Sequence, residues 1–294
     1  MMSRETSRGE ASVTLVCETF GISRQAFYAA LKAPSPRESA RPRVERPGPW
    51  SSAEELRPAI QEIVDENPAW GVRKVWATLR RRGYWVSRKR VWALMKAEGL
   101  TLPQGERRET PGRYGHVAVP DSNRRWGSDL TTVWTKADGN VAVVPVMDYG
   151  DRFVFRCDVT KSQESAPVLA PFAEALEEVF GVPTRVPEKL EWRTDHGPQY
   201  TGVDCEDLCR DWGIDHTFAP VGRPTGNAVV ERFIETLKVE LIWTRDWHST
   251  EELRQAIQAW LKKYNHERPH QALDYETPAE RRAHNLGLAR SVAA

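Results

Sequence analysis

The sequence predicts an α/β domain, a mixed five-stranded sheet with flanking helices, that is preceded by all-helical units. Between residues 13 and 100, apolar residues recur at helical spacing, with Gly and Pro separating the segments. From residue 126 onward, β-rich runs with short breaks replace that pattern. Helices and strands then alternate to the end of this region, which is typical of a sheet covered by helices.

The charge distribution also changes between the two regions. Residues 1–125 contain 23 Lys and Arg against 14 Asp and Glu, whereas residues 126–294 contain 19 against 27. A basic first half predicts a polyanionic partner, most simply nucleic acid, although a solvated basic surface would give the same balance. The longest apolar run, residues 141–147, is far shorter than the roughly 20 residues of a membrane helix. The spacing of the four cysteines suggests no disulfide framework, so we expect a cytoplasmic protein without a membrane partner.

The N-terminal region is expected to contain a pair of short helices and a linker. Residues 13–31 read as helix, Gly turn, helix, a pattern shared by DNA-binding motifs and ordinary helical bundles. Residues 33–49 contain five prolines and several arginines, which predict a stiff, extended linker.

Three further helices are expected between residues 51 and 100. Ser52 and Glu55 form a capping box at the start of the first helix, and Ser87 caps the third. Asn67-Pro68 ends the first helix, and glycines follow the second and the third. Apolar residues at helical spacing within each segment predict one small core.

The third of these helices begins with three basic residues, Arg88, Lys89 and Arg90. Positive charge at a helix N-terminus opposes the helix dipole, so a solubilising role explains it less well than contact with DNA. Recognition helices present their N-terminal residues to the groove, where Arg reads guanine and phosphate. Arg73 and Lys74, in the first turn of the second helix, are further DNA-contact candidates.

The second half of the chain predicts the sheet and the helices that cover it. A polar segment with Gly and Pro, residues 101–122, separates this half from the helical unit. The expected strands are 126–134, 140–148, 152–160, 189–194 and 214–219, and the expected helices are 162–180, 204–212, one beginning near 227, and 250–264.

Three carboxylates are placed where their side chains could meet. Asp129 lies in the first expected strand, Asp195 ends the fourth, and Glu231 lies on the helix that begins near residue 227. If strands one and four are neighbours, their aspartates converge at one edge and the helix lays Glu231 across them. Three convergent carboxylates are costly without cations, and oxygen ligands suit Mg²⁺ or Mn²⁺. Two such ions about 3.5–4 Å apart can support attack on a phosphodiester.

Two other clusters have both functional and structural interpretations. Lys238 shares a helix face with Glu231, so it is placed to hold a phosphate. Cys205 and Cys209 could form a zinc site with His266 and His270, since the cysteine spacing falls within the zinc-finger range. The helix around the cysteines is amphipathic, however, so packing in the core is the favoured interpretation.

In the order and spacing of these three carboxylates, the sequence resembles the retroviral integrases and the bacterial insertion-sequence transposases that share their D, D-x(35)-E signature. The resemblance is strongest to the second reading frame of the third insertion-sequence family. Asp195 and Glu231 are separated by 35 residues. The other motifs are Trp126-x-x-Asp129-x-Thr131, Thr194-Asp195-x-Gly197-x-Gln199-Tyr200, Gly226-Asn227-Ala228-x-x-Glu231, Lys238, the segment from Tyr264 to Leu273, and Thr277-Pro278-Ala279-Glu280.

The resemblance implies a DNA transposase with a ribonuclease-H-like core. It implies hydrolysis at the 3′ end of the element, then attack of that 3′-OH on a second phosphodiester. Asp129 would bridge two Mg²⁺ or Mn²⁺ ions, and Asp195 and Glu231 would each hold one. Arg223 and Arg268 are expected to contact the DNA backbone.

The resemblance also implies partners and a division of the chain. The partners would be the element ends and target DNA, a second copy of the protein, and an upstream-frame protein with a helix-turn-helix and a coiled coil. The location would be the bacterial cytoplasm, on the nucleoid when the protein is bound to DNA. The expected segments are a helix-turn-helix fragment with linker (1–50), a helical DNA-binding domain (51–103), a linker (104–122), the catalytic core (123–245) and a C-terminal helical extension packed on the core (246–294).

Two alternatives belong to other functional classes. A catalytically silent DNA-binding regulator could retain the same fold, but the three intact carboxylates argue against it. A simple ribonuclease H would not explain the basic helical units. Three positions depart from the usual motifs, namely Thr132, Gly226 and Trp70 before Gly71, and none of them is an expected metal ligand.

Overall fold

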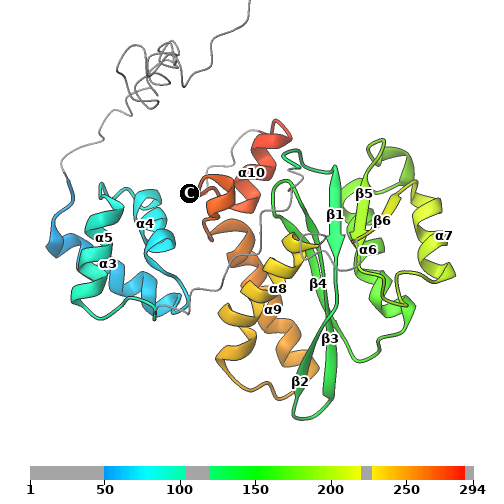
Figure 1. The fold of residues 1–294 in the computed structure, drawn as a ribbon, viewed down its shortest axis with the longest axis horizontal. Coiled ribbons are helices and arrows are strands. Elements are labelled where there is room, and N and C mark those ends of the chain that lie inside the picture. Colours follow the sequence, from blue (N-terminus) through cyan, green and yellow to red (C-terminus); the bar gives the residue numbers. More distant parts are fainter. Residues whose placement is uncertain (1–49, 104–118, 220–226, 289–294) are drawn as a thin grey trace, which may run out of the picture. The chain divides into compact units, whose positions relative to one another are not determined.

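The computed structural model describes residues 50–103, 119–219 and 227–288. The helix pair expected at residues 13–31 lies outside the described residues, as do the linker expected at residues 33–49 and Arg223. The described residues belong to one compact unit. Figure 1 shows its helices and strands with the labels used below.

The first part of this unit is a bundle of three short helices. They are α3 (Ala53–Glu66), α4 (Val72–Arg81) and α5 (Arg88–Ala97). The capping box of Ser52 and Glu55 is present, and the Ser87 hydroxyl accepts the N–H of Arg90, so both expected caps are confirmed. The bundle encloses one core, made of Leu56, Ala59, Ile60, Ile63, Trp70, Val75, Leu79, Val86, Val91 and Met95.

The second part is built on a mixed sheet. Its strands are β1 (Arg125–Ser128), β2 (Thr131–Thr135), β3 (Gly139–Asp148), β4 (Val154–Thr160), β5 (Glu191–Thr194) and β6 (Asp215–Phe218). β3 pairs antiparallel with β4 along one edge and with β1 and β2 along the other. β1 pairs in parallel with β5, and β5 in parallel with β6. The predicted fold class, a mixed sheet with flanking helices after a helical unit, is confirmed.

The strand count differs from the prediction, because the single strand expected at residues 126–134 is two strands. β1 and β2 follow one another along the same edge of β3, and the chain leaves the ladder between them at Asp129 and Leu130. There the Leu130 N–H donates to the Asp129 side chain (2.8 Å). A carboxylate that bonds its own backbone in this way competes with ladder pairing. The interruption therefore falls on one of the three carboxylates singled out by the sequence.

Helices cover both faces of the sheet. Figure 1 shows α6 (Ser165–Phe180) and α7 (Val203–Trp212) on one side of the strands, and α8 (Ala228–Glu240) and α9 (Thr250–His266) on the other. Alternate residues of β3 supply the two cores, with Val144 and Val146 facing α6 and α7, and Val143 and Met147 facing α8 and α9. The sheet is therefore buried on both faces, which explains the nearly continuous apolar run in β3.

The C-terminal residues return to the beginning of the core. After α9, a short 3₁₀ turn (Gln271–Leu273) leads to α10 (Pro278–Asn285), which begins with a capping box of Thr277 and Glu280. Arg282 of α10 donates to Asp151 (3.0 Å), which follows β3, and to Asn123 (2.9 Å), which precedes β1. Two further 3₁₀ turns span Pro183–Arg185 and Ile242–Thr244. Across the described residues, no helix has both the length and the apolar content needed to span a membrane.

Candidate active site

Asp129 and Asp195 follow the ends of two neighbouring parallel strands. In the β1–β5 ladder, Gly127 lies opposite Arg193, and each aspartate comes two residues later in its own strand direction. Parallel strands end at the same edge of a sheet, so the two carboxylates reach the same edge. The neighbouring strands that the sequence hypothesis required are therefore present.

The turn after β5 holds the Asp195 side chain in position. The Gly197 N–H donates to Asp195 Oδ1 (3.0 Å), and the Thr194 hydroxyl donates to the Asp195 carbonyl (2.9 Å). A Cβ on Gly197 would itself lie 3.0 Å from Asp195 Oδ1, so a larger residue would crowd the carboxylate. Asp195 is exposed, whereas Asp129 is partly buried.

The start of α8 is attached to the strand that carries Asp129. The Asn227 side-chain amide donates to the Ser128 carbonyl (3.2 Å), and the Tyr149 hydroxyl donates to Asn227 Oδ1 (2.6 Å). The Glu231 N–H in turn donates to the Asn227 carbonyl (3.0 Å). These contacts place Glu231 one helical turn after a residue that touches β1.

Gly127 allows this close approach of helix and strand. A Cβ at residue 127 would lie 2.4 Å from the Tyr149 ring and 2.7 Å from Val230 Cγ2, distances that real Cβ atoms do not reach. The sequence predicted no individual role in the site for Gly127, Tyr149 or Asn227. Asn227 could have been noticed as the residue preceding α8, but Tyr149 has no sequence signal that links it to the site.

Asp195 and Glu231 both affect the protonation of Asp129. The pKa of Asp129 is raised to about 6, mainly by burial and also by the negative charges of Asp195 and Glu231, while the Leu130 N–H and Lys238 act in the opposite direction. Burial also raises the pKa of Glu231. Like charges gathered at a partly buried site are unfavourable unless a cation joins them.

The donor set fits hard divalent cations. All three groups offer carboxylate oxygens, the ligand type that Mg²⁺ and Mn²⁺ prefer. Within the described residues, the three carboxylates do not all come within 4.8 Å of one another.

The predicted DNA-contact residues have different surroundings. Arg88 and Lys89 are exposed in the first turn of α5, and Arg90 is half-buried. Lys238 is half-buried on α8, close enough to Asp129 to affect its pKa. Their contact with DNA stays a prediction.

Three other candidates are bonded within the protein. Arg73 donates to Gln271 (2.7 Å), and Lys74 lies 2.8 Å from the Glu240 carboxylate. Arg268 is buried and also pairs with Glu240 (2.8 Å). For these residues, DNA contact stays a prediction that would require the internal bonds to open.

The structure places a different histidine near the two cysteines from the ones that their spacing in the sequence suggested. His270 lies against Arg268 and the Tyr264 ring rather than beside the cysteines. The histidine near Cys205 and Cys209 is His216, on β6. Both cysteines are buried where α7 packs on the core, as the core-packing interpretation expected.

Comparison with known families agrees with this architecture. The integrase core domain family matches residues 120–224 and, through a second description of that domain, residues 212–278. The HTH-like domain family matches residues 51–108.

Among characterised proteins, the chain is similar to the transposase InsD of insertion element IS2 from Escherichia coli. The two are 29% identical over 234 residues, which covers 75% of this chain and 76% of the relative. The InsD transposase of IS2 on the F plasmid gives the same values.

Solved structures of retroviral integrases are also similar. A simian T-cell lymphotropic virus intasome chain, solved with the PP2A regulatory subunit B56 gamma, has a TM-score of 0.49 at 16% identity, over 80% of this chain and 76% of that chain. The HTLV-2 integrase catalytic core with magnesium has a TM-score of 0.41 at 18% identity, over 54% of this chain and 95% of that one. The BIV integrase core has a TM-score of 0.41 at 21% identity, over 56% and 97%.

Proposed function

Because the chain belongs to the insertion-sequence transposases that carry an integrase core domain, we propose that it cuts and joins DNA at the ends of its element with Asp129, Asp195 and Glu231 as the catalytic carboxylates. The observation that supports this best is the β1–β5 register, which brings both aspartates to one sheet edge. The attachment of α8 to Ser128 adds Glu231 to the same edge.

In the proposed site, the carboxylates hold two Mg²⁺ or Mn²⁺ ions. Asp129, whose pKa is affected by the charges of both Asp195 and Glu231, would help to hold both ions, and Asp195 and Glu231 would each hold one. When bound, such ions lower the pKa of the attacking hydroxyl and stabilise the charge on the leaving oxygen. Lys238 adds a positive charge on the same helix as Glu231, where it holds a phosphate of the substrate.

The proposed reaction has two steps of the same kind. In the first, water attacks the phosphorus at the 3′ end of the element, the P–O3′ bond breaks, and a free 3′-OH and a 5′-phosphate remain. In the second, that 3′-OH attacks a phosphodiester of the target, and one P–O bond replaces another. No side chain of the protein becomes bonded to the DNA in either step.

DNA binding by the helical unit and assembly of more than one copy belong to the same proposal. Arg88, Lys89 and Arg90 provide exposed or partly exposed positive charge at the start of α5. Arg223, Arg73, Lys74 and Arg268 remain candidates for the DNA backbone. A short upstream-frame protein is proposed as an additional partner.

The decisive experiment is a cleavage and joining assay with a labelled duplex that carries the ends of the element. Asp129→Asn, Asp195→Asn and Glu231→Gln should each reduce both reactions by at least roughly 1,000-fold and leave DNA affinity within about twofold. Asp121→Asn, which removes an exposed carboxylate outside the site, is the matched control and should behave as wild type.

The metal requirement is tested in the same assay. Mg²⁺ or Mn²⁺ should support both reactions, and Ca²⁺ should not, because its longer and more variable coordination holds the reacting groups too loosely. Turnover in excess EDTA, or near-normal joining by any of the three variants, would overturn the assignment. Tight DNA binding by the wild type with no cleavage under any metal would instead support a silent regulator.

A further inference from the structure

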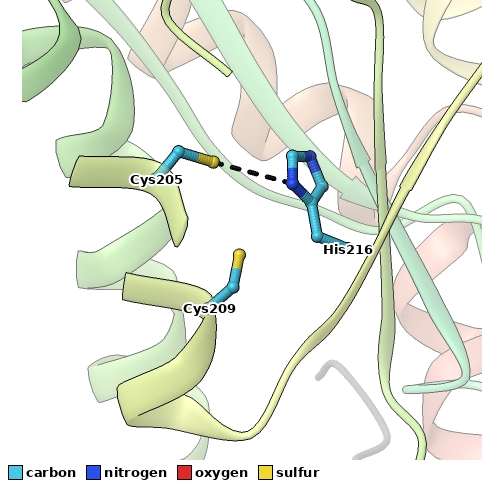
Figure 2. Close-up of side chains that lie close together, drawn as sticks. All are labelled: Cys205, Cys209 and His216. Carbon is cyan, nitrogen blue, oxygen red and sulfur yellow. Dashed lines mark hydrogen bonds between the residues drawn. The ribbon is translucent and has the colours of Figure 1, made fainter. Parts of the chain in front are cut away.

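We propose that Cys205, Cys209 and His216 form a second metal site, one that takes Zn²⁺ or a similar thiophilic cation, next to Thr194. Figure 2 shows the two cysteines on neighbouring turns of α7, with both sulfur atoms directed toward the His216 ring. This site is chemically distinct from the carboxylate site, and it does not depend on the proposed function.

The spacing of the three donors is close to that of a zinc shell. Zinc binds Cys sulfur at about 2.3 Å and His nitrogen at about 2.0–2.1 Å in tetrahedral geometry, so neighbouring donors lie roughly 3.5–3.8 Å apart. The Cys205 Sγ to His216 Nδ1 distance is 3.8 Å. All three donor atoms lie within 4.8 Å of one another, and within the described residues no other trio of His, Cys, Asp or Glu meets that spacing.

The hydrogen bonds of His216 prepare Nδ1 to act as a ligand. The single hydroxyl proton of Thr194 is donated to the Asp195 carbonyl (2.9 Å). The contact between Thr194 Oγ1 and His216 Nε2 (3.0 Å) must therefore use a proton on Nε2. In the neutral ring, Nδ1 then presents its lone pair to Cys205. Histidines that bind metals usually have this arrangement, with the second ring nitrogen donating to an oxygen.

Aromatic packing fixes the direction of the same ring. His216 stacks on Trp192, with ring centroids 5.0 Å apart, and contacts Phe218 at 4.5 Å. Cys205 and Cys209 are buried, so the donors lie where water competes poorly for the ion. Three protein donors would leave the fourth position of a tetrahedral Zn²⁺ ion for a water molecule.

A disulfide between the two cysteines fits this geometry less well than a shared ion. Residues four apart on a helix have Cβ atoms about 5–6 Å apart, whereas a disulfide requires about 3.5–4.5 Å. Closing the bond would distort α7, and both cysteines are free in the structure. A metal can join the two sulfur atoms without moving the helix.

The proposed ion would stabilise the sheet edge that carries Asp195. It would join α7 to β6 and keep His216 against Thr194, which is the residue that holds the Asp195 carbonyl. The site therefore acts on the position of Asp195 through Thr194, and it has no direct part in the chemistry.

The test uses a background variant in which Cys17→Ser and Cys157→Ser remove the other two cysteines. Reduced, folded protein is titrated with Co²⁺, and the sulfur-to-cobalt charge-transfer band is followed in the near ultraviolet. The band should reach full intensity at one bound Co²⁺ ion per chain, and Zn²⁺ should abolish the band by displacing Co²⁺. Ions bound at the carboxylate edge give no such band, so the two sites are distinguished.

Single substitutions in this background locate the ligands. Cys209→Ser and His216→Gln should each weaken Zn²⁺ binding by at least roughly 100-fold, and Thr194→Val by roughly 10-fold.

Zn²⁺ at about 100 times its Kd should raise the Tm of the background protein by roughly 5–10 °C, and circular dichroism checks that each variant is folded. Absence of the band in the folded background protein would overturn the proposal. Unchanged affinity in folded Cys209→Ser or His216→Gln would also overturn it.

Discussion

At the scale of single residues, Gly127 controls how closely the helix of Glu231 approaches the strand of Asp129. It lies in β1 beneath Val230 of α8, and the Tyr149 ring lies beside it. The Tyr149–Asn227 and Asn227–Ser128 hydrogen bonds hold the same junction on its polar side. The approach of Glu231 to Asp129 in the proposed site therefore depends on residues that carry no charge.

We predict that Gly127→Ala reduces strand transfer by roughly 100-fold, because a displacement of about 1 Å in a reacting group can have an effect of that size. The added methyl must displace Tyr149 or Val230, so we also expect a loss of about 1–3 kcal/mol in the free energy of unfolding. Urea denaturation and the joining assay measure the two effects. Gly202→Ala is the control, because a Cβ there meets its nearest atom at 3.6 Å. Activity of Gly127→Ala within twofold of wild type would contradict this account of the junction.

At the scale of elements, α5 combines an apolar inner face with a basic first turn. Val91 and Met95 are buried in the helical bundle, while Arg88 and Lys89 face solvent. Within the described residues, no carboxylate forms an ion pair with any of the three basic side chains. The Ser87 cap compensates in part for positive charge placed at the unfavourable end of the helix dipole.

We expect the triple variant Arg88→Ala, Lys89→Ala, Arg90→Ala to bind an element-end duplex more weakly and with less dependence on salt. Each lost phosphate contact lowers the slope of log K against log salt by about 0.9, so three contacts lower it by about 2.7. A salt titration of binding measures the slope, and circular dichroism confirms the fold. Lys96→Ala, at the other end of α5 and against Trp92, is the matched control and should keep the wild-type slope. A folded triple variant with unchanged slope would show that this helix does not hold DNA.

At the scale of the whole molecule, the C-terminal helix closes the core onto its own beginning. Arg282 of α10 contacts Asp151, Asp148 and Asn123, which lie in or near the β1 and β3 ends. Both aspartates are fully buried, and the Arg282 guanidinium also lies 4.7 Å from the Phe155 ring. These contacts join the C-terminal helix α10 to the segments around β1 and β3.

Removing this cation should destabilise the protein strongly. We predict a loss of about 3–5 kcal/mol in the free energy of unfolding for Arg282→Met, because two buried carboxylates would lose their cationic partner. Arg232→Met, which breaks an exposed pair with Glu235 on α8, should cost less than about 1 kcal/mol. Urea midpoints of the two variants give the comparison. Equal, small losses would mean that α10 contributes little to the stability of the core.

The sequence alone was sufficient for features that depend on near neighbours in the chain. The caps at Ser52 and Ser87, the helices of the first bundle and the order of strands and helices all follow from local spacing, and all are present. The three carboxylates could be named because each sits at a recognisable place in an element, namely a strand, a strand end and a helix start. The family resemblance pointed to the same three carboxylates, and the comparisons with known proteins support that resemblance.

The tertiary structure decided what depends on pairing between distant segments. Only the β1–β5 register could show that Asp129 and Asp195 share an edge, and only the two ladders with β3 could show that the first expected strand divides at Asp129. The cysteines of α7 met His216 rather than the histidines suggested by spacing, and Arg268 was paired with Glu240 inside the protein. The physical reason is common to these cases. Local hydrogen bonding determines where an element begins and ends, whereas burial and ladder pairing across the sheet determine which elements become neighbours.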